Sequence, residues 1–243
     1  MLHTEGIVLR TVKYGETSLI AEVLTLEKGL QSFIIGGVRT ARGGRKKSIS
    51  QLMSIIDIVS YYSEHKTLHR VKEVGYHYLY RHLPFDLVKR SVGLFLLEMV
   101  RNTIIGSEYE PGMYHFIKKQ FIYLDMQEKV PAIFPLVFML DFSRYLGFYP
   151  GPYHGQDDYF DLRNGIFTSS VPDHVEYVLP PTAEALDKLR TIDPSTPNPY
   201  FNRQVRDDLI TLLLDYYAIQ IDHFKMPVSL SILKELLHGP DRS

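Results

Sequence analysis

The sequence contains no cysteine among its 243 residues. Disulfide bonds, thiolate nucleophiles and zinc sites built from thiolates are therefore excluded, and the composition is typical of a reducing compartment. Long apolar runs are also lacking, because no stretch approaches the roughly 18 apolar residues that span a membrane. The opening MLHTEGIVLRTVKYGE has neither the apolar core nor the cleavage site of a secretory signal. We expect a soluble, cytoplasmic protein with no membrane partner.

An excess of one charge is lacking as well, since the net charge is only −1. The charges are nevertheless unevenly distributed. Residues 1–82 carry 12 Lys and Arg against 7 Asp and Glu, a net charge of +5, whereas residues 83–243 carry 15 against 21, a net charge of −6. A basic module followed by an acidic one predicts two faces with different partners. Chance variation between two ordinary domains is the alternative.

The first 80 residues have the pattern of short strands. Apolar and β-branched residues fill five runs, several of them alternating with polar residues, and turn sequences such as KYGETS, EKG and SEHK separate them. Five short strands with regular turns predict a small closed or nearly closed barrel. The predicted strands are residues 6–12, 18–26, 30–35, 52–62 and 67–76.

Beyond residue 83 the apolar residues recur at helical spacing. The pattern predicts a helix from Pro84 to Gly106, and prolines suited to a first helical turn begin two more, at 111–126 and 131–145. A fourth long helix is expected around 205–217, with shorter ones at 182–190 and 229–237. The fold class is therefore α+β, with two domains at 1–82 and 83–243. Residues 148–181, rich in Pro, Gly and aromatic residues, form an irregular insertion with one expected hairpin around Asn164-Gly165.

The strongest local motif is GGVRTARGGRKKS at residues 36–48, here called the basic segment. It contains five cations and no acid, and four glycines leave its backbone pliable. Such a segment suits sequence-independent binding to a phosphate backbone, driven by the release of counterions. A charged but inert surface turn is the alternative. The five cations, which we predict to bind DNA, are Arg39, Arg42, Arg45, Lys46 and Lys47.

Motifs for catalysis are missing. Lys47-Ser48 follows Lys46 where a nucleotide-binding P-loop needs glycine, and no helical pattern comes after it. No His-Glu-x-x-His and no Gly-x-Ser-x-Gly is present. Asp157, Asp158 and Asp161 offer oxygen ligands for a metal ion, but a solvated acidic turn is the favoured explanation, since the glycine and carboxylate spacing of an EF-hand does not follow. The sequence therefore predicts a protein that is not an enzyme and that has no cofactor or metal.

Aromatic residues accompany the predicted strands, and an exposed aromatic ring on a barrel stacks on unpaired bases. Filling the barrel core is the alternative for each of them. Helical apolar faces bordered by cations are in turn candidates for binding an acidic, amphipathic peptide. The aromatic candidates are Tyr14, Phe33, Tyr61, Tyr62, Tyr76 and Tyr78, and the helical cations are Lys118, Lys119, Arg203 and Arg206.

Three stretches of the sequence resemble the RecO family. These are T-x-G-I-V-L-R-T-x-x-Y-G-E-T-S-L-I, then V-L-T-L-E-K-G-L, then G-G-V-R-T-A-R-x-G-x-K-K-S, followed by L-G-F-Y-P after the third helix. The specific motifs cover mainly the first 50 residues, while the order of barrel, helices and loop covers the chain. The resemblance implies an OB-fold barrel and places the basic segment in the family's DNA-binding region. Arg10 and Lys13, which flank the first barrel turn, are weaker candidates for DNA binding.

The resemblance also implies a function in DNA repair and homologous recombination. RecO proteins bind single- and double-stranded DNA and anneal complementary strands without ATP. With RecR, they help to load the recombinase RecA onto DNA coated by single-stranded DNA-binding protein (SSB), whose acidic C-terminal tail they contact. From the residues alone, an RNA- or ribosome-binding OB protein remains an alternative, as does a metal-dependent nuclease that uses the three aspartates.

One departure from the family pattern concerns zinc. Many RecO proteins have a four-cysteine zinc module after the third helix of the helical part, where this chain has PGPYHGQDDYFDLRNGIFTSSVPDH. Without cysteine, we expect no zinc site. Aromatic packing must then hold the insertion together, and the rings available are Tyr153, Tyr159, Phe160 and Phe167.

Overall fold

The computed structural model describes residues 1–38, 51–104, 110–155 and 157–237. The chain divides into two compact units, each described by itself below. The first comprises Met1–Leu97 with Ile104–Gln127, and the second comprises Glu98–Thr103 with Glu128–Ser243. In the described parts of the chain, no helix is both long and apolar enough to cross a membrane.

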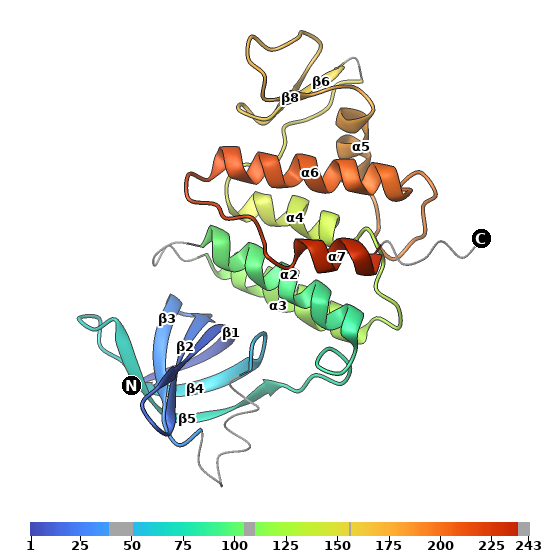
Figure 1. Ribbon diagram of the computed structural model, residues 1–243. Helices are drawn as coiled ribbons and strands as arrows, with labels where there is room; N and C mark the ends of the chain where they lie inside the picture. The colour runs from blue at the N-terminus through green and yellow to red at the C-terminus, as the bar shows by residue number, and fades with distance from the viewer. Residues whose placement is uncertain (39–50, 105–109, 156, 238–243) are drawn as a thin grey trace. The chain divides into compact units, whose positions relative to one another are not determined.

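Five strands of the first unit close into a barrel (Figure 1). They run in the order β1-β2-β3-β5-β4, and closure comes from parallel pairing of β3 with β5, all other pairs being antiparallel. The predicted five-stranded barrel and the α+β class are confirmed. The strands are β1 (Leu2–Tyr14), β2 (Ser18–Thr25), β3 (Gly29–Ile35), β4 (Ile55–Tyr61) and β5 (Leu68–Tyr78).

The predicted start of the fourth strand at Leu52 is wrong, because β4 begins at Ile55. Leu52 and Met53 lie in a turn, where Met53 has a φ of 69°. A residue other than glycine rarely adopts this left-handed conformation. Tertiary bonds hold it: the Met53 N–H donates to the Val8 carbonyl at 2.8 Å, and the Tyr80 hydroxyl donates to the Met53 carbonyl at 2.8 Å. No strand propensity predicts this turn.

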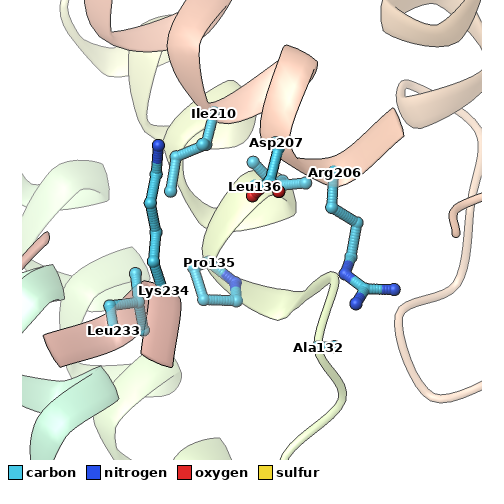
Figure 2. A pocket seen from close by; sticks show the side chains of 8 residues that line it. All are labelled: Ala132, Pro135, Leu136, Arg206, Asp207, Ile210, Leu233 and Lys234. Atoms are coloured by element: carbon cyan, nitrogen blue, oxygen red, sulfur yellow. The ribbon is translucent and has the colours of Figure 1, made fainter. Parts of the chain in front are cut away.

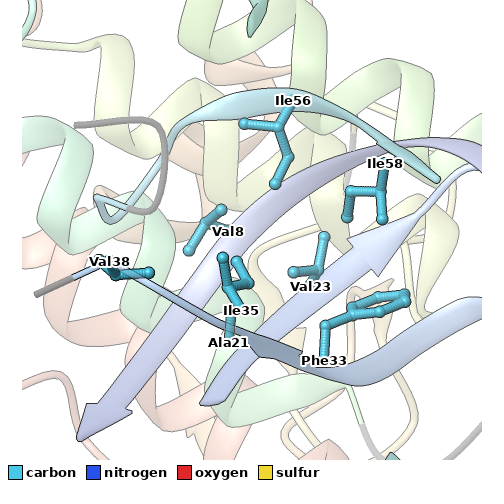
Figure 3. Packing of buried hydrophobic residues seen from close by; sticks show 8 residues of the cluster. All are labelled: Val8, Ala21, Val23, Phe33, Ile35, Val38, Ile56 and Ile58. Atoms are coloured by element: carbon cyan, nitrogen blue, oxygen red, sulfur yellow. The ribbon is translucent and has the colours of Figure 1, made fainter. Parts of the chain in front are cut away.

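Alternation along the strands fills the barrel. Successive side chains of a strand point to opposite faces, so every second residue points inward. The inward residues are almost wholly buried and pack on one another (Figure 3). This cluster is Val8, Ala21, Val23, Phe33, Ile35, Val38, Ile56 and Ile58.

Part of the outer wall of the barrel is covered as well. Ile7 is paired with Leu24 on one side and Ile55 on the other, and all three outward side chains are at most 1% exposed. Helix α3 (Pro111–Met126) contacts the wall beside them. Its Tyr114 hydroxyl donates to the Glu5 carboxylate at 2.6 Å. Ile7, Leu24 and Ile55 therefore extend the buried core of the first unit to the outside of the barrel wall.

The Glu5 carboxylate is the polar centre of this contact. Besides the Tyr114 hydroxyl, it binds the Lys118 ammonium at 2.7 Å and His77 Nε2 at 3.0 Å. Burial raises the pKa of Glu5, but the hydrogen bonds from Lys118 and Tyr114 and the charge of Lys118 outweigh it, so the pKa lies below its ordinary value. Glu5 is therefore ionised in the folded protein.

The Asp125 carboxylate, at the end of α3, holds the segment that follows β5. The backbone N–H groups of His82 and Leu83 donate to Oδ1 at 2.8 and 2.7 Å. That of Arg81 donates to Oδ2 at 3.0 Å, and the Tyr78 hydroxyl donates to Oδ2 at 3.1 Å. Burial raises the pKa of Asp125, yet these bonds lower it below the ordinary value. The carboxylate satisfies three backbone donors that no strand or helix satisfies.

The second unit is built from helices. Tyr217 of α6 donates its buried hydroxyl to the Met139 carbonyl of α4 at 2.7 Å, and the Asn202 side chain caps the N-terminus of α6. The helix predicted from Pro131 begins only at Phe134, because the preceding residues form a turn. The helices are α4 (Phe134–Tyr145), α5 (Thr182–Leu189), α6 (Arg203–Gln220) and α7 (Leu230–Leu237), with the last residues of α2 (Leu87–Thr103).

The insertion contains a small sheet of order β7-β6-β8, formed by β6 (Tyr159–Asp161), β7 (Ile166–Thr168) and β8 (Tyr177–Val178). The predicted hairpin is confirmed, since β6 pairs with β7 around Gly165 at a φ of 66°. Aromatic packing is also confirmed. The rings of Phe160 and Phe167 are buried with centroids 4.9 Å apart.

We predict that Asp125→Ala lowers the free energy of unfolding of the full chain by about 3–5 kcal/mol. The substitution leaves three buried or partly buried backbone donors without an acceptor, and each costs about 1–3 kcal/mol. Urea unfolding followed by circular dichroism measures the change. Glu64→Ala, which removes an exposed carboxylate, is the control. A loss below 1 kcal/mol in Asp125→Ala would contradict this role.

A second prediction concerns acid. Because the folded pKa of Glu5 is lowered, its stabilising contribution is complete above the unfolded value near 4.5 and is lost as the pH falls towards the folded value. Glu5→Gln should therefore reduce stability at pH 7 and flatten the decline in stability as the pH falls below about 4.5. Unfolding measured across this range checks it, with Glu64→Gln as control. Parallel curves for Glu5→Gln and the unchanged chain would refute the prediction.

Candidate nucleic-acid interface

The five cations of the basic segment all lie outside the described residues. The structure does describe where the chain leaves the barrel, at Val38, and where it returns, at Gln51. The surroundings of these two flanks are described below. The cations concerned are Arg39, Arg42, Arg45, Lys46 and Lys47.

The segment leaves the barrel beside the β1–β2 turn. Ile35, the last residue of β3, is paired with Leu19, and a Cβ on Gly36 would lie 3.9 Å from the Ser18 hydroxyl. Ser18 is in turn paired with Tyr14 at the end of β1. Strand pairing thus brings the exposed Tyr14 to the edge from which the basic segment departs.

Lys13 and Arg10, the two flanking candidates, differ in their surroundings. Lys13 is exposed and paired with Leu19, next to the departing chain. Arg10 lies further along β1, where its guanidinium is 3.2 Å from the Glu22 carboxylate on β2. The nearby Glu22 carboxylate offsets part of the charge that Arg10 would offer to a phosphate. Lys13 is thus the flanking cation that adds positive charge at this edge.

Among the aromatic candidates, the proposal for Phe33 is wrong, because its ring is wholly buried in the barrel core. Tyr78 donates its hydroxyl to Asp125 and is part of the contact with α3. The Tyr62 ring packs on His69 with centroids 4.5 Å apart. Tyr14 and Tyr61, by contrast, are 48% and 57% exposed. These two rings are open to a ligand.

The four helical cations do not form one group. Lys118 and Lys119 belong to α3 in the first unit, and Lys118 is bound to Glu5. Arg203 and Arg206 belong to α6 in the second unit. The Arg206 guanidinium donates to the Phe201 carbonyl at 2.8 Å. The partner-binding role of these four cations stays a prediction, and of the four only Arg206 lines an apolar hollow.

Such a hollow lies between α4, α6 and α7 in the second unit (Figure 2). The hollow is shallow: its empty space is about 290 Å³ with open solvent included, of which about 20 Å³ is room for the centre of a water molecule. Apolar side chains form most of the lining, with Arg206 and Lys234 projecting on different sides and Asp207 between them. Sequence reasoning missed Lys234, because only folding brings α7 beside α6. The apolar lining residues are Ala132, Pro135, Leu136, Ile210 and Leu233.

The aspartates of the insertion do not make a metal site. The Asp157 carboxylate accepts the backbone N–H of His154 at 2.9 Å, and that of Asp161 accepts from the backbone and side chain of Asn164 at 3.0 and 2.7 Å. Across the described ranges, His, Asp and Glu side chains form no cluster of three able to hold a metal ion. These carboxylates shape turns.

Two family models match most of the chain. The family model of the Recombination protein O N-terminal region matches residues 1–79, and that of the C-terminal region matches residues 84–229. The DNA repair protein RecO of Christiangramia forsetii is 32% identical over 244 residues, covering 97% of this chain and 99% of the relative. That of Phocaeicola vulgatus is 30% identical over 235 residues, covering 96% and 98%.

A RecO protein of Bacteroides fragilis strain YCH46 is 32% identical over 237 residues, covering 96% of this chain and 98% of the relative. The two family models together take in nearly the whole chain, barrel and helices alike. The resemblance carried by the first 50 residues therefore extends to both units. This chain belongs to the RecO family of recombination proteins.

Proposed function

We propose that this protein is a DNA repair and recombination mediator that binds single- and double-stranded DNA through the barrel edge where the basic segment departs. The observation that carries the proposal is the strand register at that edge. Lys13 and Tyr14 end β1 beside Ser18, and Ser18 adjoins the start of the segment at Gly36. Positive charge and an open ring therefore gather where five more cations follow in the chain.

Contact through phosphates explains why both kinds of DNA bind. Lysine and arginine side chains that neutralise phosphates release counterions from either form of DNA, without reading the bases. The segment has five cations and no acid within nine positions. The remaining functions rest on family membership: annealing of complementary strands without ATP, and loading of RecA, together with RecR, onto SSB-coated DNA.

The proposal predicts a change in salt dependence when the basic segment is neutralised. Each phosphate contact to a single strand contributes about 0.7 to the slope of log K against log salt. Removing four cations should weaken binding at every sequence and reduce that slope by up to about 2.8. Fluorescence anisotropy with a labelled oligonucleotide across a salt series measures it. The substitutions are Arg42→Ala, Arg45→Ala, Lys46→Ala and Lys47→Ala.

The matched control removes four exposed cations elsewhere, so that the net charge changes equally. It should leave the slope within about 0.7 of that of the unchanged chain. An unchanged slope in the variant of the basic segment, or an equal fall in the control, would refute the proposed interface. The control substitutions are Arg101→Ala, Lys119→Ala, Lys129→Ala and Lys225→Ala.

We further propose that the hollow between α4, α6 and α7 receives the C-terminal tail of SSB. That tail is acidic and ends in apolar residues, so its receptor needs an apolar floor with cationic edges. Leu136, Ile210 and Leu233 provide such a floor, and Arg206 and Lys234 provide the edges (Figure 2). Asp207 is the one acid in the lining, and its carboxylate lies 4.0 Å from the Arg203 guanidinium on the preceding turn of α6.

Binding of the tail should be modest and sensitive to salt, because the second part of the chain is acidic overall. We predict a Kd in the micromolar range, or roughly −8 kcal/mol, for a fluorescent acidic peptide with an apolar carboxyl end. Arg206→Ala with Lys234→Ala should weaken it about tenfold, as for the loss of about 1.4 kcal/mol. Arg101→Ala with Lys129→Ala, which removes two exposed cations elsewhere, serves as the control. Peptide binding that survives the α6–α7 substitutions but is lost on neutralising the basic segment would show that DNA and the tail share one site.

A further inference from the structure

The barrel is closed by one short ladder between β3 and β5, here called the seam. The seam has three residue pairs, whereas every other ladder of the barrel has at least six. The seam is also the parallel ladder, and parallel pairs are slightly less stable than antiparallel ones. The barrel is therefore opened most easily at this place. The three pairs are Ser32–Leu68, Phe33–His69 and Ile34–Arg70.

A buried histidine occupies the middle of the seam. His69 is 1% exposed and lies opposite Phe33, whose ring fills the inside of the barrel (Figure 3). The ring centroids of His69 and Phe33 are 5.9 Å apart, and the ring of Tyr62, which follows β4, lies 4.5 Å from His69. Histidine is the side chain whose charge ordinarily changes between about pH 5 and 8. The seam is thus centred on a group that can become charged inside the core.

Hydrogen bonds fix which ring nitrogen of His69 carries the hydrogen. The Gln31 side-chain NH₂ donates to the Lys28 carbonyl at 2.8 Å, which turns the Gln31 carbonyl oxygen towards His69 Nε2 at 3.2 Å. That oxygen only accepts, so Nε2 carries the hydrogen of the neutral ring and Nδ1 carries a lone pair. Nδ1 is buried, and it has no hydrogen-bond partner among the described residues. A second proton on this ring would therefore lack an acceptor.

The charges around His69 oppose a second proton as well. The Lys28 ammonium lies 5.5 Å from the ring centroid of Tyr62, which itself packs on His69. Glu64 is 3.6 Å from Lys28 with a side chain that is 76% exposed, so it compensates a cation in solvent rather than a charge on the buried ring. Burial, together with the charge of Lys66, holds the pKa of His69 below its ordinary value of 6.5. Inside the seam, the ring is neutral.

We propose that His69 is a pH-sensitive lock on the closure of the barrel: the neutral ring holds β3 against β5, and a proton on Nδ1 opens the seam. A charge without an acceptor is costly in the core, so the ring gains its second proton only when it reaches water. Since His69 lies between Leu68 and Arg70 on the same strand, this movement separates all three pairs. Opening leaves the backbone edges of β3 and β5 without partners on this side.

The direction of the pH dependence follows from the proton taken up on opening. A histidine with a lowered pKa in the folded state contributes stability that is complete above the unfolded value of 6.5. That contribution is lost as the pH falls from 6.5 towards the folded value. One proton is taken up, so the equilibrium constant for opening rises by at most about tenfold per pH unit in this window. The Glu5 carboxylate acts at lower pH, below about 4.5, and is thus separable.

Amide hydrogen exchange of the full chain, followed by NMR, tests the lock at individual residues. After correction for the intrinsic effect of pH on exchange, the amides bonded across the seam, in residues 32–34 and 68–70, should exchange up to about tenfold faster at pH 5.5 than at pH 7.5. The amides of the β1–β2 ladder should not change. His69→Gln keeps a donor for Gln31 and does not titrate, so its seam should exchange at the same corrected rate at both pH values.

His65→Gln is the matched control, because His65 is exposed in the turn between β4 and β5. This variant should keep the full pH dependence of the unchanged chain. A direct titration of the imidazole signals needs no variant at all, and it serves if His69→Gln fails to fold. In the unchanged chain, His69 should stay neutral at a pH at which His65 is already protonated, and it should gain its proton only as exchange at the seam accelerates.

Three results would overturn the lock: equal corrected exchange of the seam at both pH values, the same acceleration in His69→Gln as in the unchanged chain, or an equal acceleration in all strands of the barrel. Protonation of His69 together with His65, with the seam still closed, would overturn it too. None of these measurements involves DNA, so they do not depend on the proposed function.

Discussion

One buried carboxylate, that of Asp125, organises the first unit. Its oxygens accept three consecutive backbone N–H groups and a tyrosine hydroxyl, so it fixes the segment that leaves β5 against the end of α3. Burial of a charge is costly unless hydrogen bonds compensate it. Here the compensation comes from donors that otherwise lack partners. The end of α3 and the end of the barrel are therefore joined without any regular secondary structure between them.

A second anchor determines how much of the barrel wall remains open. Glu5 binds Tyr114 and Lys118 near the middle of α3, while Asp125 holds the end of the same helix. With two anchors, α3 stays against one part of the wall, where Ile7 and its partners are buried. The part of the wall that α3 covers is thus a consequence of where two carboxylates hold the helix.

Local patterns in the sequence predicted the elements but not the contacts between them. The alternation of apolar and polar residues predicted the five strands. Prolines suited to a first helical turn predicted where three helices begin, to within a few residues. The turn at Met53 depends on hydrogen bonds to Val8 and Tyr80, which no local pattern contains. For the same reason, Lys118 is indistinguishable in sequence from a free surface cation, although it is bound to Glu5.

For the candidate site, too, the sequence showed which residues to consider but not which of them lie together. Five cations in one segment are visible in the sequence, and Tyr61 was among the aromatic candidates. The register that places the buried Phe33 opposite His69 depends on closure of the barrel, which pairs residues far apart in the chain. The hollow that includes Lys234 depends likewise on packing of α7 beside α6. Composition and alternation reveal which residue types are present, whereas pairing decides which of them share a surface.

The insertion shows how a loop region is ordered without cysteine. Phe160 and Phe167 are buried against each other, and the Asp161 carboxylate accepts the backbone N–H groups of Arg163 and Asn164. Burial raises the pKa of Asp161, but hydrogen bonds from Asn164, Arg163 and His174 hold it below the ordinary value. The Asp161 carboxylate thus fixes a turn, and the two phenylalanine rings form a small core. In zinc modules a metal ion stabilises the fold instead.

We propose that annealing without ATP would follow from the same kind of contact. Cations that bind phosphates do not read the bases, so on this proposal the basic segment holds either of two complementary strands and leaves their bases free to pair. Each step of the duplex then gains on average about 1.4 kcal/mol from stacking. The free energy of annealing therefore comes from the strands themselves, and the protein needs only to bring them together.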